Sequence, residues 1–414
     1  MFSWCSRKNA SLSENCDEKS EKYHIKKAFE ENYGFWMIFG GFYPCVGILP
    51  CIYIPSAVFL SIIFIMTTVN ISNSEIAIKS ESVHFIVFIT IELTAMTVFI
   101  FKKKTIDEIY RAMGRRFYDY ENTLDEECYD VIANAYKSGR SRKKIFHDMF
   151  VGCSMSTLLT ASIVRPLLSY FKGDPDPNDG ILRVLPVPLW TPFKTKTWYV
   201  NLLFFLAEDV IAYMTPGIVF GCILFVVCAS EDVGAQLIIL GHTLKSVVRR
   251  AEGLDMPREE ALKLCFVHSI KHHQMLLKYI KSLEAIIYLP GFVLLFGSTI
   301  LMCMSGFIFV SKEVAFISKV EFFLFLLSEM AVIFLICWCG EFIQTTSTQI
   351  FDMVYSSEWP DNMESMKNFV LIIQLRSIDS IKLNLGGFMV ASLETFGNIC
   401  SSAFSYFDLM LAVN

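Results

Sequence analysis

Seven long apolar runs divide this chain of 414 residues, and they constrain its fold more than any other feature. A run of about 20 apolar residues can cross the ~30 Å hydrocarbon core of a bilayer as an α-helix. A helix also satisfies its own backbone hydrogen bonds, which lipid cannot do. The sequence therefore predicts an all-α, polytopic membrane protein. The expected spans are 42–69, 83–101, 150–170, 198–229, 286–310, 320–339 and 383–411.

The composition supports this class and argues against several functions. Charged residues make up 19% of the chain, whereas soluble domains carry about a quarter. The net charge of −5 gives no indication of a nucleic-acid partner. The sequence has no phosphate-binding loop, nucleophile elbow or paired metal-binding helix motif. We therefore expect neither an enzyme nor a cofactor.

The distribution of Lys and Arg predicts the orientation of the chain, because cytoplasmic connections carry an excess of these residues. Of the 36 Lys and Arg residues, 28 lie in the N-terminus and in connections 102–149, 230–285 and 340–382. Seven lie in the alternate connections. We therefore expect a cytoplasmic N-terminus and, after seven spans, an extracellular C-terminus. This orientation is the reverse of that of a G-protein-coupled receptor.

Helical periodicity continues beyond the spans. Segment 230–285 repeats apolar residues at helical spacing, which predicts that spans four and five extend as helices into the cytosol. An amphipathic stretch at 363–373 precedes the last span. The expected organisation is an N-terminal segment 1–34, a bundle 35–229, an extension 230–285, two spans 286–339, anchor helices 340–382 and a last helix 383–414.

Short motifs, mostly in the second half of the chain, occur in a specific order. They are Leu185-Pro186, Trp190, Pro192, Cys265, His268, Glu284, Cys337-Trp338-Cys339-Gly340-Glu341, Ser347, Tyr355, Trp359, Gly386-Gly387-Phe388, Ser392-Leu393-Glu394-Thr395-Phe396 and Phe404-Ser405-Tyr406-Phe407-Asp408-Leu409. With seven spans and a cytoplasmic N-terminus, this order resembles the insect odorant receptor family.

The resemblance implies a heterotetrameric, ligand-gated, non-selective cation channel in the plasma membrane of sensory neurons. A subunit of this kind binds a small apolar volatile and assembles with a shared odorant co-receptor, with membrane lipid around it. Its last helix lines the pore. Two alternatives stay open: a gustatory-type homotetrameric channel, and a G-protein-coupled receptor, which would need an external N-terminus.

The last span is too polar for contact with lipid alone. It carries nine Asn, Ser, Thr, Asp or Glu side chains, which are costly in hydrocarbon unless they meet protein or water. A buried helix with its hydroxyls bonded to backbone is one interpretation, and the resemblance favours a pore-lining helix. Leu409 would then form an apolar constriction that gates by dewetting. The expected pore and gate residues are Leu409, Asp408, Ala412, Tyr406 and Ser405.

The resemblance places the ligand pocket among spans two, three, four and six. Their outer halves are rich in aromatic residues with few polar groups, which suits a small apolar volatile. Each of these residues is equally compatible with ordinary helix packing or lipid contact. The candidate ligand residues are His84, Phe85, Phe88, Ser156, Thr160, Ile163, Phe204, Phe205, Glu208, Phe322, Phe325 and Glu329.

Several other charged or polar residues have two interpretations. Arg165 is the one basic residue within a span and is a possible structural partner for Glu92, Glu208, Asp209 or Glu329. The spacing of His268 and His272, beside His273, could seat zinc, but we expect a packed or solvated helix face and no metal. The amphipathic stretch before the last span suits packing within the chain or a subunit interface. The candidate interface residues are Tyr355, Trp359, Met366, Phe369 and Ile373.

Overall fold

The computed structural model describes residues 20, 22–34, 36, 38, 50–72, 76–121, 123–164, 198–312, 314, 316–359 and 363–413. Residues 42–49 of the first expected span and 165–170 of the third, including Arg165, lie outside this part. So does the segment that contains Leu185, Pro186, Trp190 and Pro192.

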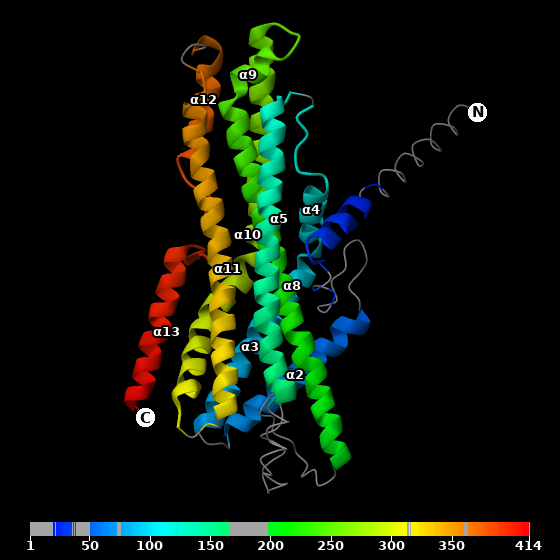
Figure 1. Cartoon of the computed structure of the whole chain (residues 1–414), viewed down its shortest axis with the longest axis vertical. Helices are drawn as coiled ribbons and strands as arrows, with labels where there is room; N and C mark the ends of the chain where they lie inside the picture. Colours follow the sequence, from blue (N-terminus) through cyan, green and yellow to red (C-terminus); the bar gives the residue numbers. More distant parts are fainter. Residues whose placement is uncertain are drawn as a thin grey trace, which may run out of the picture.

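Helices make up nearly all of the described chain, and the longest of them run along one common axis (Figure 1). They are α2 (Pro50–Ser72), α3 (Ile76–Phe101), α4 (Lys103–Gly114), α5 (Glu126–Leu159), α8 (Trp198–Lys245), α9 (Val247–Glu252), α10 (Arg258–Val310), α11 (Phe316–Tyr355), α12 (Met363–Ser377) and α13 (Leu393–Val413). A further helical segment covers residues 22–31, and a π-helical turn at Thr160–Val164 continues α5. The predicted all-α class is confirmed.

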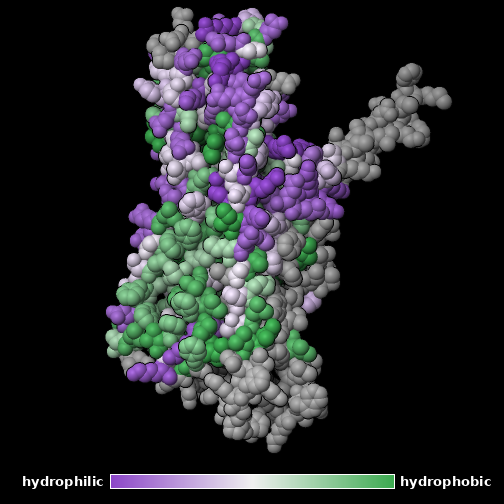
Figure 2. Space-filling model, in the orientation of Figure 1, coloured by the Kyte–Doolittle hydropathy of each residue, from purple (hydrophilic) through white to green (hydrophobic). Residues whose placement is uncertain are grey.

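Four described helical stretches are long and apolar enough to cross a membrane. They are Ser82–Phe101, Gly217–Lys245, Arg258–Val310 and Phe316–Tyr355, and a shorter apolar stretch covers Ala57–Val69. Each overlaps a predicted span. Figure 2 shows the apolar surface as a broad band over the lower half of the molecule, with hydrophilic atoms above it.

The longest helices reach far beyond this apolar band. The 53 residues of α10 correspond to about 80 Å and the 48 of α8 to about 72 Å, against ~30 Å of hydrocarbon. Their polar halves pack with α5, α9, α11 and α12 in the upper part of Figure 1. The membrane-spanning part of α10 is therefore its apolar C-terminal half, from about Ile286, and the rest is a polar extension.

Two ion pairs join α5 to α8 where the apolar part of both helices ends. Arg142 Nε lies 2.8 Å from Glu231 Oε2, and Lys143 Nζ lies 2.5 Å from Asp232 Oδ1. Lys143 also donates to Asn32 Oδ1 at 2.7 Å, which ties in the N-terminal helical segment. These acids interrupt the apolar face of α8, and their pairing with α5 compensates for their burial.

The last helix is shorter than the sequence suggested. We expected a helix from Leu383, but α13 begins at Leu393, after a two-stranded hairpin of β1 (Asn384–Leu385) and β2 (Met389–Val390). Gly386 and Gly387 turn this hairpin with φ of 65° and 76°, which other residues adopt only at a cost. Ser392 then caps the helix, because its Oγ accepts the Thr395 N–H at 3.2 Å.

Candidate ligand site and pore helix

A buried polar cluster joins three helices inside the apolar part of the bundle. His84 on α3 is 1% exposed. Its Nε2 lies 3.4 Å from Glu329 Oε1 on α11, and its Nδ1 lies 3.3 Å from Ser305 Oγ on α10. Ser305 Oγ also donates to Glu329 Oε2 at 3.4 Å. The three side chains satisfy one another's polar atoms, which makes their burial in an apolar surrounding possible.

Aromatic rings enclose this cluster. The ring of His84 lies 5.3 Å from Phe322, 5.3 Å from Phe325 and 5.7 Å from Phe85, measured between centroids. Phe322 and Phe325 in turn lie 5.6 Å apart. Five of the residues that we had predicted for the ligand site therefore come together: His84, Phe85, Phe322, Phe325 and Glu329.

The recorded contacts of the other described candidates lie elsewhere in the chain. Phe88 packs against the main hydrophobic core. Thr160 Oγ1 donates to the Ser156 carbonyl at 2.8 Å, within the end of its own helix, and Ile163 is 54% exposed. The side chains of three further candidates on α8 lie outside the described part, namely Phe204, Phe205 and Glu208.

Sequence reasoning missed Ser305. It lies in the apolar half of α10, which also carries Ser298 and Thr299, and is fully buried. A hydroxyl in a spanning segment could have indicated it, but its partners lie 221 and 24 residues away along the chain. Glu92, two turns from His84 on α3, is also fully buried, and neither of its carboxylate oxygens has a hydrogen-bond partner among the described residues.

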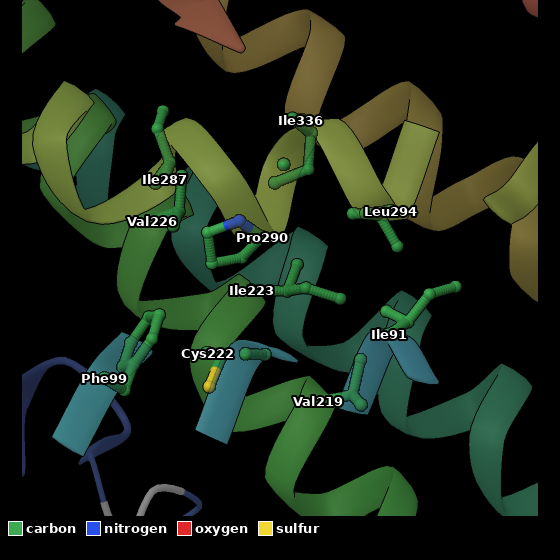
Figure 3. A pocket seen from close by; sticks show the side chains of 12 residues that line it. Ile91, Phe99, Val219, Cys222, Ile223, Val226, Ile287, Pro290, Leu294 and Ile336 are labelled. Atoms are coloured by element: carbon green, nitrogen blue, oxygen red, sulfur yellow. The ribbon is translucent and has the colours of Figure 1, made fainter. Parts of the chain in front are cut away.

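A small apolar cavity of about 40 Å³ lies further along the same helices (Figure 3). Ile91 and Phe99 of α3 face Ile223 of α8 and Pro290 of α10 across it. A space of this size holds a few water-sized molecules at most, and its lining offers almost no polar atoms. It is too small for an odorant. Pro290 removes one backbone hydrogen bond from α10 beside this space.

Helix α13 uses one face for packing. Met410 and Phe407 approach Cys303 and Gly306 of α10, and Phe396 lies 5.7 Å from Phe334 of α11, measured between rings. The Glu341 carboxylate of α11 accepts the Leu393 N–H at 3.2 Å, which stabilises the first turn. In Figure 1, α13 lies at the outside of the bundle and ends at its apolar end.

The opposite face of α13 is uncovered in this chain and carries a row of polar residues beside the exposed apolar side chains of Phe404, Leu409 and Leu411. Leu409 is 60% and Tyr406 57% exposed, and Ser405, Asp408 and Ala412 are exposed as well. Six residues along the middle of this face follow one another at alternating intervals of four and three positions, which places them on one side of the helix. They are Glu394, Asn398, Ser401, Ser405, Asp408 and Ala412.

Comparison with known proteins identifies the family. The family model described as 7tm Odorant receptor matches residues 77–404. The chain belongs to the odorant receptor family. This receptor is similar to odorant receptor 10 of Aedes albopictus, with 21% identity over 77% of this chain and 80% of that protein. It is also similar to odorant receptor 49a of Drosophila melanogaster, with 20% identity over 82% of both chains.

One further alignment is shorter. Odorant receptor 83a of Drosophila melanogaster is 24% identical over 38% of the receptor described here and 35% of that relative. Among solved structures, the insect olfactory receptor OR5 from Machilis hrabei in complex with eugenol superposes with a TM-score of 0.80. That comparison covers 95% of this receptor and all of the other chain at 14% identity, so it establishes the shared fold.

The polar extension of the receptor holds the histidines with helical spacing. His272 Nδ1 lies 2.7 Å from the Tyr120 hydroxyl, and His268 Nδ1 lies 2.9 Å from the Tyr118 hydroxyl. Burial, with the neighbouring His273, lowers the pKa of His272 to about 3. The described residues contain no cluster of three or more His, Cys, Asp or Glu suited to a metal ion. These histidines join the α4–α5 connection to α10.

The amphipathic helix α12 of the receptor divides its apolar residues between two faces. Met366 and Ile373 are buried within the chain, and Phe369 stacks on Phe266 of α10 at 5.1 Å. The outward face carries apolar residues that the sequence analysis did not single out. They are Leu371, Ile372 and Leu375, exposed by 46%, 59% and 71%. Tyr355 is also exposed and Trp359 half-buried.

Proposed function

We propose that this chain is the ligand-sensing subunit of an odorant-gated, non-selective cation channel. Its membership of the odorant receptor family supports a membrane receptor, and the uncovered polar face of α13 supports the channel. Polar side chains in a bilayer need water or protein. A ring of such helices around a shared axis would give this face an aqueous conduit.

Within that conduit, Leu409 would be the gate. It is a large apolar side chain on the exposed part of α13, one residue after Asp408. A ring of leucines can close a pore by excluding water, and carboxylates beside it favour cations. Ser405, Tyr406 and Ala412 would line the approaches.

The ligand would bind beside the polar cluster of His84, Ser305 and Glu329. The rings of Phe85, Phe322 and Phe325 offer apolar contact, and the cluster can exchange a hydrogen bond with one polar group. This combination suits a small, mostly apolar volatile with one hydrogen-bonding function. Phe88, Ser156, Thr160, Ile163, Phe204, Phe205 and Glu208 would define the remaining shape of the pocket.

The partner in the channel would be the odorant co-receptor shared by this family, in a heterotetramer. The outward apolar face of α12 with the exposed Tyr355 supports a contact between subunits in the polar extension. The complex would lie in the plasma membrane of a sensory neuron, with the N-terminus and this extension in the cytosol.

Whole-cell recording from cells that express this chain alone, the co-receptor alone, or both tests the proposal. We expect volatile-evoked cation current only with both subunits and at ligand concentrations that leave the co-receptor alone silent. Evoked current from this chain by itself would favour a homotetrameric channel of the gustatory type. Silence to a broad volatile panel, with both subunits shown at the cell surface, would contradict the proposed function.

A further inference from the structure

A second cavity, larger and polar, lies away from the proposed ligand site. It measures about 460 Å³ and opens where the N-terminal helical segment 22–31, the end of α4, α5 and α8 meet. This volume falls within the range of about 300–1,000 Å³ that is usual for small-molecule sites. Neither the proposed pore nor the proposed odorant pocket uses it.

The charged side chains that line this cavity are mostly cationic. Four are basic and two are acidic, which gives a net positive charge. The basic residues are Lys27, Arg116, Arg140 and Lys143, and the acidic residues are Glu31 and Asp232.

The two carboxylates are already paired. Lys143 Nζ lies 2.5 Å from Asp232 Oδ1, and Lys27 Nζ lies 3.9 Å from Glu31 Oε1. These pairs neutralise two of the four cations.

Arg116 and Arg140 remain. Neither guanidinium group has an acidic partner or a hydrogen bond among the residues that the structure describes. Both are exposed to solvent at the cavity. Two guanidinium groups facing one space are a receptor for a multiply charged anion, because each can bind a phosphate oxygen pair in a bidentate fashion.

The position of the cavity indicates where that anion comes from. On α8 the apolar stretch ends at Ala229, and on α5 the last charged residue is Asp148. The Lys143–Asp232 pair therefore lies at the border of the membrane-spanning part. Figure 2 shows hydrophilic atoms gathered directly above the apolar band. Exposed Lys102 and Lys104 at the junction of α3 and α4 add positive charge on the same side of the band. Basic groups at this level attract anionic lipid head groups.

We propose that this cavity binds a multiply phosphorylated inositol head group, with Arg116 and Arg140 as its principal ligands. The same chemistry is present in a phosphoinositide lipid and in a soluble inositol phosphate. Lys143 fixes the floor of the site through Asp232 and Asn32. Occupancy would join the N-terminal segment to α5 and α8, and so stabilise the polar border of the bundle. The inference does not depend on the proposed odorant channel.

Binding to the purified full-length receptor in phosphatidylcholine nanodiscs tests this site. The probe is a fluorescent, short-chain phosphatidylinositol bisphosphate, with inositol trisphosphate as the soluble competitor. The test variant is Arg116→Gln with Arg140→Gln. The matched control, Lys263→Gln with Lys271→Gln, removes the same charge from exposed positions on α10 that do not line the cavity.

We expect the arginine variant to weaken probe binding at least tenfold and the lysine control to change it less than twofold. Full displacement by inositol trisphosphate would assign the site to the head group alone, and weak displacement would assign it to the intact lipid; both outcomes support the proposal. Because the exposed guanidinium groups of Arg116 and Arg140 make no described ion pair or hydrogen bond, the variant should keep the thermal stability of the receptor. Equal binding by the arginine variant, or an equal loss in the lysine control, would overturn the inference.

Discussion

His84 Nε2 lies 3.4 Å from Glu329 Oε1, inside a bundle whose surrounding side chains are almost all apolar. The two residues come from different helices, α3 and α11, and Ser305 of α10 bridges them. A change in one of these helices therefore changes the polar environment of the others. Helix α10, which carries Ser305, also packs against α13.

The first prediction concerns this contact. We expect His84→Phe and Glu329→Gln each to raise the odorant concentration for half-maximal current about tenfold. In the double variant this concentration should rise by less than the product of the two single factors, because either change alone already breaks the contact. A coupling of about 1 kcal/mol is usual for residues in direct contact. Concentration–response curves in cells with the co-receptor measure it.

Leu327→Ala is the matched control for this cycle. Leu327 lies on α11, two residues before Glu329, and is 43% exposed on the outside of the helix. Its response should stay close to that of the unmodified chain. Strictly multiplicative effects of the His84 and Glu329 changes would show that the two residues act separately.

A second prediction concerns the gate. Replacing Leu409 by Ser should raise the resting cation leak or alter ion permeation when the chain is paired with the co-receptor. A polar ring holds water where an apolar ring excludes it. Basal current and reversal potential in voltage clamp measure the change. Unchanged basal and evoked currents, at equal surface expression, would remove Leu409 from the gate.

The third prediction is a pH dependence of stability in the polar extension. The folded state holds His272 neutral with its pKa at about 3, whereas the unfolded value is near 6.5. Between these values the unfolded state binds more protons, so stability falls as pH decreases below about 6.5. One such group contributes up to about 1.4 kcal/mol per pH unit in that window. The melting temperature of the purified receptor should therefore drop from pH 7 to pH 5.

His272→Gln tests which group is responsible. The amide can still bond to the Tyr120 hydroxyl but does not titrate, so the decline between pH 7 and pH 5 should become shallower. His273 contributes in the same direction, because burial, with Arg376, lowers its pKa to about 4. A decline of undiminished slope in His272→Gln would assign the effect to other groups.

A fourth prediction concerns the ion pair between α5 and α8. Lys143→Met removes the cation that faces Asp232 in a buried position and should destabilise the receptor by about 3–5 kcal/mol, because an uncompensated charge remains. Adding Asp232→Leu should recover much of this loss. Thermal unfolding of the single and double variants in detergent measures both steps. A double variant no more stable than Lys143→Met would contradict a charge-based cause.

The fifth prediction concerns the contact between α11 and Ala391, which lies between β2 and α13. A Cβ on Gly340 would lie 2.1 Å from the Ala391 carbonyl oxygen, and backbone cannot yield as a side chain can. We expect Gly340→Ala to reduce surface delivery severely, measured by surface biotinylation. Gly152→Ala is the control, because a Cβ there has no neighbour within 4 Å and alanine favours the helix. Normal delivery of Gly340→Ala would contradict this close packing.

Local sequence predicted most of the helices but did not set every boundary correctly. The third span was expected from residue 150, whereas α5 begins at Glu126. Apolar length alone located α3, α8, α10 and α11, since the thickness of the bilayer fixes how many residues must be apolar. The same criterion placed the start of the last helix ten residues too early, because an apolar hairpin and an apolar helix have similar hydropathy. The glycine pair at 386 and 387 and the cap Ser392 were visible in the sequence and carried the correct signal.

The candidate ligand site was predicted only in part. Aromatic richness singled out Phe85, Phe322 and Phe325, and the rarity of charge in a span singled out Glu329. Ser305 was missed, and nothing local distinguishes it from other hydroxyls in apolar helices. Ser156 and Thr160 were chosen by position on a helix, yet the hydroxyl of Thr160 bonds to the carbonyl of Ser156 in its own helix. Which side chains of two neighbouring helices meet depends on how each helix is rotated about its own axis, and a single sequence does not specify that rotation.

The sequence by itself determined that this chain crosses a membrane as helices, because the need to satisfy backbone polar groups in lipid acts on each segment separately. Its ordered motifs also identified the family. Tertiary structure alone decided which buried polar groups meet, which face of α12 is left uncovered, and that Arg116 and Arg140 face one cavity. These features depend on contacts between residues far apart in the chain, and their free energy arises only when the helices pack.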